Sequence, residues 1–226
     1  FADIQTQILY QISKRSQMGF LGYFAYNNYL FIPKTKQTVF GSLEKQYQMS
    51  IAIDGSEQNL TSSIAGSLWN TWSFSETSNL KLLTSVFRSH ENESYDISSF
   101  YWLNQMESSV DKNSLDSVQN LAVGSYFKHA RNELLATIST TSLLYNNEFG
   151  ISTFSSGIEF QHHEIDENLN MWTYVDSADY NIPYSETAIN LKGTVFNKIN
   201  YRSDEGNAFL QNTWKLQMED HLMSIT

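Results

Sequence analysis

Histidines and carboxylates occur side by side at one point of the chain, in the segment His162-His163-Glu164. On a β-strand successive side chains alternate between faces, so His162 and Glu164 would share a face while His163 would point to the other. Two ligands on one face can begin a metal site, but the segment lacks the H-E-x-x-H spacing, and the sequence fixes no third ligand. We therefore predict no metal site here and interpret the segment as the solvated end of a strand.

Paired carboxylates, such as Glu91 and Glu93, are the second group that could do chemistry. Such a pair could act as the acid and base of a glycosidase, and clustered carboxylates could bind a divalent cation. The sequence has no G-x-S-x-G elbow, no glycine-rich phosphate loop and no cysteine nucleophile. We predict that the protein is not an enzyme and that it needs no cofactor.

Aromatic side chains form the third group, because their faces stack on sugars and on aromatic ligands. Several lie within or beside long polar stretches, and surface loops often carry binding residues. The aromatic residues that we predict to contact substrate are Tyr101, Trp102, Trp172, Tyr174 and Tyr184. These side chains could equally pack the loops against one another.

The charge of the chain is concentrated in two stretches. The formal net charge is −10, and residues 91–119 and 164–205 each contribute −5, which leaves the rest of the chain neutral. An acidic chain without clustered lysine and arginine is a poor match for a phosphate backbone, so we predict no nucleic-acid partner. Neutral strands combined with charged connections fit a membrane β-barrel.

Period-two alternation of apolar and polar residues is the dominant pattern, and it predicts an all-β chain. In the first such segment Ile4, Ile8 and Ile12 share one face, while glutamines occupy the other. No run of about 18 apolar residues is present that could form a membrane helix. The segments with this alternation are 3–12, 18–26, 62–74, 79–88, 132–145 and 208–216.

The connections between these segments alternate between short and long. Tight turns are expected at 13–16, 75–78, 146–148 and 218–221, and long loops at 32–61, 90–120 and 164–205. Tight turns at one end and long loops at the other are typical of an outer-membrane barrel. We therefore predict a transmembrane antiparallel up-and-down β-barrel of which this chain supplies about eight strands, with the long loops outside the cell.

Aromatic residues near the tight turns fit the same interpretation, because membrane barrels carry aromatic belts at both interfaces. The residues that we predict at a membrane interface are Tyr10, Phe20, Trp72, Phe74, Tyr145, Phe149 and Trp214. Ordinary strand packing also favours aromatic residues. The predicted belt therefore depends on the placement of the whole set.

Two other architectures fit the alternation. A soluble, secreted β-sandwich, such as a carbohydrate-binding or adhesive module, would bury the face of Ile4, Ile8 and Ile12 in its own core. A small closed barrel of about eight strands would require the two ends of the chain to lie near the true ends of the protein. Because residues 221–226 stop within a strand-like segment, we expect instead an excerpt of a larger barrel.

Several segments resemble a known family. They are FGSLEK (40–45), ENESYDI (91–97), FYWLN (100–104), DSVQNLAVGSYFKHARN (116–132), GIEFQHHEI (157–165), MWTYVDSADYNIPYS (171–185) and QNTW (211–214). Together they resemble the barrel of TonB-dependent outer-membrane receptors of Bacteroidetes-type bacteria. The most specific piece is W-x-x-x-D-S-A-x-Y-x-x-P-Y, from Trp172 to Tyr184, in which Asp179 replaces the glycine of the family.

The resemblance implies a barrel of about 22 strands in the bacterial outer membrane that imports a scarce nutrient. The nutrient would be a siderophore, a vitamin, a glycan or a peptide. The implied partners are outer-membrane lipid, a surface lipoprotein and the TonB complex, which acts through a plug domain. No plug domain or TonB box is recognisable in residues 1–226, so the resemblance places this chain in the interior of the barrel domain.

Overall fold

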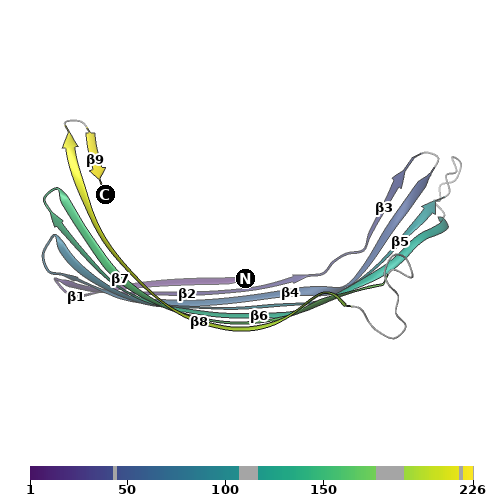
Figure 1. The fold of residues 1–226 in the computed structure, drawn as a ribbon, viewed down its shortest axis with the longest axis horizontal. Helices are drawn as coiled ribbons and strands as arrows, with labels where there is room; N and C mark the ends of the chain where they lie inside the picture. The colour runs from purple at the N-terminus through teal and green to yellow at the C-terminus, as the bar shows by residue number, and fades with distance from the viewer. Residues whose placement is uncertain (43–44, 107–116, 177–190, 219–220, 226) are drawn as a thin grey trace.

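The computed structural model describes residues 1–42, 45–106, 117–176, 191–218 and 221–225, and these form β-strands joined by turns (Figure 1). The strands are β1 (Ala2–Ser13), β2 (Ser16–Phe31), β3 (Lys36–Gly41), β4 (Gln46–Ser73), β5 (Ser78–Met106), β6 (Ser117–Phe149), β7 (Ser152–Asp176), β8 (Leu191–Met218) and β9 (His221–Ile225). None of the described residues belongs to a helix long and apolar enough to cross a membrane.

All strands belong to one antiparallel sheet of up-and-down topology, in the order β1-β2-β4-β5-β6-β7-β8-β9, while β3 pairs with the beginning of β4. The predicted all-β class and the predicted topology of about eight neighbouring strands are therefore confirmed. The two edges of the sheet, β1 and β9, are not paired with each other in the described part of the chain. These residues form an open sheet and not a small closed barrel.

The strands are much longer than the sequence predicts. Strands β4 to β8 contain 25 to 33 residues each, which corresponds to roughly 80–110 Å of extended chain. The prediction of loops at 32–61, 90–120 and 164–205 is wrong for most of these residues, because β3 to β8 extend into all three stretches. Regular alternation of apolar and polar residues is lost there, for example from Arg88 to Asp96, although the backbone hydrogen bonds continue. Residues 107–116 and 177–190 lie outside the described part.

The tight turns lie at one end of the sheet, on the left of Figure 1. Residues 14–15 join β1 to β2, and residues 74–77 join β4 to β5, close to the predicted positions. The turn expected at 146–148 is displaced to Gly150 and Ile151, because β6 continues to Phe149. Gly150 has a φ of 54°, a conformation that favours glycine. Strand β8 ends at Met218 and β9 begins at His221.

The strand register sorts the side chains into two faces. One face, here called the belt face, carries Ile8, Phe20 and Leu68 on one rung, meaning one row of residues paired across the sheet. The next rung toward the turns continues the same face with Leu82, Leu143, Ile158 and Ala208. The opposite face, here called the polar face, carries Gln7, Ser67, Ser85, Thr140 and Gln161 on one rung.

The sheet is curved into a trough (Figure 1). Along β4 and β5 the belt-face residues Ile64, Leu68 and Val86 are 58%, 51% and 47% exposed. Their polar-face neighbours Ser63, Ser67 and Ser85 are half-buried, and so are less exposed than the belt-face residues. Side chains on the concave side of a curved sheet converge and shield one another, so the polar face is the concave one.

Candidate membrane-facing belt and outer polar cluster

On the belt face, the part of β2, β5 and β7 next to the tight turns carries a run of apolar side chains, and further apolar side chains such as Phe100 lie on this face farther along β5. Counted from the first residue after a turn, the last apolar residue in this part is Phe24 in β2, Val86 in β5 and Phe160 in β7. Each of the spans 16–24, 78–86 and 152–160 therefore contains nine residues. A tilted strand crosses the hydrocarbon core of a bilayer with about 9–11 residues.

The belt is bounded on its far side by polar residues. In β5 the next belt-face residues after Val86 are Arg88 and His90, and in β7 the next after Phe160 are His162 and Glu164. Within the three nine-residue spans, the charged residues Lys81 and Glu159 both lie on the polar face, by strand alternation and register. The belt is thus free of charge over the described residues of these spans.

The belt does not follow the rungs of the sheet but crosses them obliquely. Strand β2 begins at Ser16, and the residue of β7 on the same rung is Ser156. Strand β7 itself begins at Ser152, so its first residue lies four positions nearer the turns than this rung. At the other boundary the belt of β2 ends at Phe24, whose rung meets β7 at Glu164. The belt of β7 ends at Phe160, which again lies four positions nearer the turns than this rung. Both boundaries of the belt therefore shift in the same direction and by the same amount.

The size of this shift can be compared with a barrel. Four strand-to-strand steps separate β2 from β7, so the boundary moves by one residue per strand. A rise of about 3.3 Å for each lateral step of about 4.8 Å corresponds to a tilt of roughly 35°. Strands of membrane barrels tilt by about 35–45°. A flat layer perpendicular to a barrel axis would cut the strands in this way.

Six of the seven aromatic residues predicted at a membrane interface share the belt face. They are Tyr10, Phe20, Trp72, Tyr145, Phe149 and Trp214. The seventh, Phe74, lies in the turn after β4 and is 56% exposed. Phe154, which the sequence analysis did not single out, contacts Tyr145 with 6.4 Å between ring centroids. The aromatic set is therefore concentrated on one face, largely near the turns.

The polar face at the height of the belt carries hydrogen-bonding and charged side chains, together with apolar ones such as Leu21 and Leu144. The Ser142 hydroxyl donates to Glu159 at 2.8 Å, and Gln161 donates to the same carboxylate at 2.8 Å. The Lys81 ammonium lies 5.5 Å from the centroid of the Trp69 ring. The charged Glu159 and Lys81 side chains on this face are suited to contact with water and not to an apolar core.

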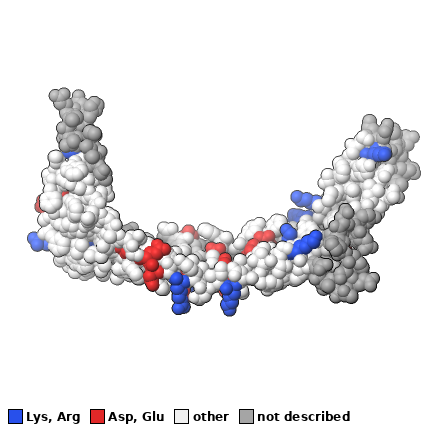
Figure 2. Space-filling view, viewed as in Figure 1, with Lys and Arg blue, Asp and Glu red and all other residues white. Residues whose placement is uncertain are grey.

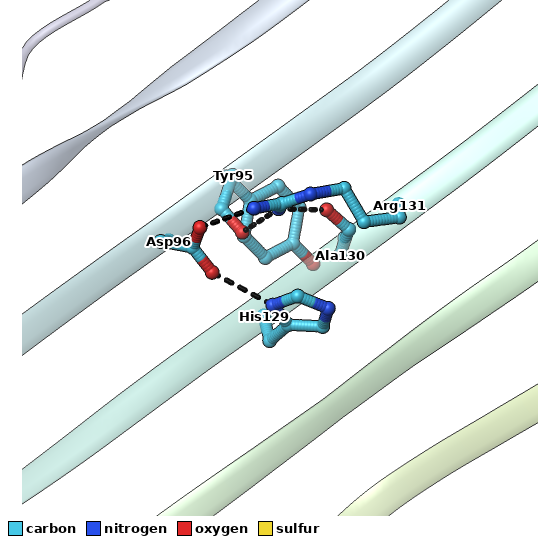
Figure 3. Close-up of polar contacts among 5 residues, drawn as sticks. All are labelled: Tyr95, Asp96, His129, Ala130 and Arg131. Carbon is cyan, nitrogen blue, oxygen red and sulfur yellow. Dashed lines mark hydrogen bonds and ion pairs between the residues drawn. The ribbon is translucent and has the colours of Figure 1, made fainter.

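Farther from the turns, a group of polar and aromatic side chains gathers on the belt face; we call it the outer polar cluster. Asp96 of β5 lies between two side chains of β6 (Figure 3). Its Oδ1 is 2.7 Å from His129 Nδ1, and Arg131 donates a hydrogen bond to its Oδ2. The His129 ring stacks on Trp172 of β7 at 4.9 Å between centroids, and the Phe127 ring lies 5.5 Å from the same indole, again between centroids.

Arg131 is held in place by backbone oxygens as well as by Asp96. Its Nη1 donates to the carbonyl of Tyr95 at 3.1 Å and to the carbonyl of Ala130 at 2.6 Å (Figure 3). Burial alone would raise the pKa of the Asp96 carboxyl, but hydrogen bonds from Arg131 and His129, together with their charges, hold that pKa below its ordinary value. Asp96 is therefore an ionised anchor between two strands.

A glycine makes room for the backbone of Asp96. Gly55 of β4 has a φ of +111°, in the region that favours glycine, and a Cβ at this position would lie 2.0 Å from the Asp96 carbonyl oxygen. The conformation of Gly55 therefore permits β4 to approach β5 closely beside the outer polar cluster.

Other cross-strand pairs occupy the belt face between the belt and this cluster. His90 Nε2 lies 2.9 Å from Glu133 Oε1. Arg202 pairs with Glu164 at 2.6 Å, and His162 Nδ1 lies 2.7 Å from Asp204. Figure 2 shows charged side chains gathered over the middle of the sheet, while the arm next to the tight turns carries few.

The histidine segment at 162–164 behaves as strand periodicity predicts. His162 and Glu164 point to the belt face, and His163 points to the polar face, where its Nε2 lies 4.0 Å from Glu205. His162 and Glu164 take separate partners on β8 and do not converge. Among the described residues no group of three or more histidines and carboxylates is arranged to hold a metal ion.

The aromatic residues predicted to contact substrate are not gathered at one place. Trp102, Trp172 and Tyr174 point to the belt face, whereas Tyr101 points to the polar face. The Tyr101 hydroxyl there packs on Gly124, since a Cβ on that glycine would lie 2.3 Å from it. Tyr184 lies outside the described residues. Only Trp172 joins the outer polar cluster, in which Asp96 lies more than 30 residues away from His129 and Arg131 along the chain.

Comparison with known proteins gives no relative for this chain: no family model matches it, and the search of curated proteins finds no significant match.

Proposed function

We propose that this chain forms part of the wall of a transmembrane β-barrel in a bacterial outer membrane. The observation that carries the proposal is the oblique apolar belt, which keeps a width of nine residues in β2, β5 and β7 while its position shifts by one residue per strand. In a barrel the belt face would meet lipid, and the concave polar face would line the lumen. The unpaired edges β1 and β9 would then pair with further strands of the barrel.

We further propose that the barrel belongs to a TonB-dependent receptor that imports a scarce nutrient. This step rests on the family resemblance of segments such as ENESYDI at 91–97 and MWTYVDSADYNIPYS at 171–185. Strands that continue far beyond the belt support it, because they would raise the polar half of the sheet above the membrane on the outer side. Substrate would bind among the outer segments and the plug, and the TonB complex would supply the energy. The proposed role is transport and not catalysis.

A soluble β-sandwich is the competing hypothesis. Its two sheets would bury apolar side chains along most of the strand length, whereas here the belt occupies nine residues of strands with 25 or more. A sandwich core would also leave its outer face polar along the whole strand. An uncharged apolar segment of equal width in three strands, followed on the same face by charged residues such as Arg88 and Glu164, favours the barrel.

Fractionation of the native host cells, followed by electrophoresis of boiled and unboiled samples, tests the proposal. A closed barrel satisfies its backbone hydrogen bonds internally and resists detergent until it is heated. We expect the protein in the outer-membrane fraction, with a mobility that changes on boiling. A protein that is released without detergent and migrates identically in both lanes would exclude the barrel and favour the sandwich.

A further inference from the structure

A surface pocket of about 460 Å³ lies at the far boundary of the apolar belt, between β2, β4, β5 and β6. Its apolar part includes Phe24 and Ile64, the last belt residues of their strands, which are 42% and 58% exposed. Its polar part belongs to the first belt-face residues beyond the belt. The pocket is lined by, among others, Phe24, Ile64, Leu135, Arg88, His90 and Glu133.

Arg88 distinguishes this pocket from the rest of the belt face. It pairs in register with Ile64 on one side and with Thr137 on the other, so neither cross-strand neighbour is acidic. The side chain is exposed, and over the described residues it makes no hydrogen bond or ion pair. Two other arginines of the same face, Arg131 and Arg202, are each neutralised by a carboxylate.

The one carboxylate in the pocket is already engaged. Glu133 lies 2.9 Å from His90 Nε2, across the strand pair β5–β6. Glu133 therefore has a partner other than the Arg88 guanidinium, whose charge remains available. The pocket as a whole places an unpaired cation directly beside exposed apolar side chains, at the height where the belt ends.

We propose that this pocket binds the phosphate group of a membrane lipid, a proposal that rests on the transmembrane placement proposed above. Arg88 would hold the phosphate through its two-pronged guanidinium. Phe24, Ile64 and Leu135 would contact the first carbons of the acyl chains. A free anion from water would gain nothing from these apolar contacts, so the pairing of cation and apolar surface favours a lipid headgroup at the membrane interface.

Native mass spectrometry of the full-length protein in a neutral detergent tests this site, with dimyristoyl phosphatidylglycerol as the probe. The test variant is Arg88→Gln. The matched control is Arg202→Gln, which changes the net charge equally but removes an arginine already paired with Glu164. We expect the affinity for the first phosphatidylglycerol molecule bound to be about tenfold lower in the Arg88→Gln variant than in the wild type. The Arg88→Lys variant should retain part of this affinity. Arg202→Gln should bind like the wild type.

Three results would overturn the proposal. The first is equal phosphatidylglycerol binding by the wild type and Arg88→Gln. The second is binding of dimyristoylglycerol, which lacks the phosphate, to the wild type as tightly as phosphatidylglycerol. The third is displacement of the lipid by inorganic phosphate alone. The heat-dependent mobility of each variant shows whether its barrel is intact. Failure of the proposed function would instead appear as a protein that needs no detergent, so the two failures are distinguishable.

Discussion

His129 Nδ1 lies 2.7 Å from Asp96 Oδ1, which links β5 to β6 beyond the apolar belt, and Arg131 binds the second oxygen of the same carboxylate. The three side chains together form a network across the two strands, with the indole of Trp172 stacked on the imidazole. Such a network stabilises the sheet where apolar contacts no longer cover its face.

Replacement of Asp96 by asparagine should destabilise the outer part of the sheet. The Asp96 side chain is 45% exposed, so solvent screens its ion pairs, and we expect a loss of about 1 kcal/mol in the free energy of unfolding. Urea unfolding of the refolded full-length protein in liposomes measures this change. The control is Asp54→Asn, because Asp54 has no ion pair among the described residues. Equal stability of the Asp96→Asn variant and this control would refute the stabilising role.

The contribution of Asp96 should depend on pH in a defined direction. Its pKa in the folded protein lies below the ordinary value of about 3.9. A lowered pKa means that the stabilisation is present above the unfolded pKa and is lost as the pH falls through the folded pKa. The stability difference between wild type and Asp96→Asn should thus shrink as the pH falls from about 5 to about 3. A difference that grows on acidification would contradict the assigned ion pairs.

An arginine in the belt should be costly, and the same arginine beyond the belt should not. Ile158 lies on the belt face within the nine-residue span of β7 and is 59% exposed. We expect Ile158→Arg to reduce stability in liposomes by about 2–4 kcal/mol. Thr137→Arg, on the same face but opposite Glu164 beyond the belt, should change it by less than about 1 kcal/mol. Equal effects of the two substitutions would show that the belt does not contact lipid.

Gly55 should tolerate no side chain. Alanine there would need a φ of +111° and a Cβ 2.0 Å from the Asp96 carbonyl oxygen. We expect Gly55→Ala to cost about 1–3 kcal/mol. Gly66 offers the control in the same strand, since a Cβ there meets no atom within 4 Å. If urea unfolding gave the same midpoint for both variants, the close approach of β4 to β5 would not limit this position.

The belt half of each strand could be predicted from the sequence, because only there does apolar alternation report the strand period. Ile4 with Ile8, and Leu80 with Leu82, alternate with residues of the polar face, and the strands predicted around them are present. Beyond the belt the alternation that marks a strand is lost, and the stretch from Arg88 to Asp96, for example, is almost entirely polar on both faces. The sequence therefore predicted loops where the backbone ladder continues.

The outer polar cluster could not be predicted, because its contacts depend on the register between long strands. Asp96 and His129 come together only if β5 and β6 pair residue by residue from their shared end near the turns. The segments ENESYDI and KHARN contain these residues, but nothing local connects them. The Trp172 indole was singled out as a ligand contact, whereas the structure places it against His129 and Phe127.

The most direct test of the belt measures what surrounds its side chains. This chain contains no cysteine, so spin labels can be attached to single cysteines introduced at Val86 and at its strand neighbour Ser85, in a cysteine-free form of the full-length protein in liposomes. We expect the label at Val86 to collide with oxygen dissolved in lipid and to be shielded from a water-soluble nickel chelate, with the opposite result at Ser85. A label at Val86 that is shielded from both agents, as in a packed protein core, would contradict the membrane-facing belt.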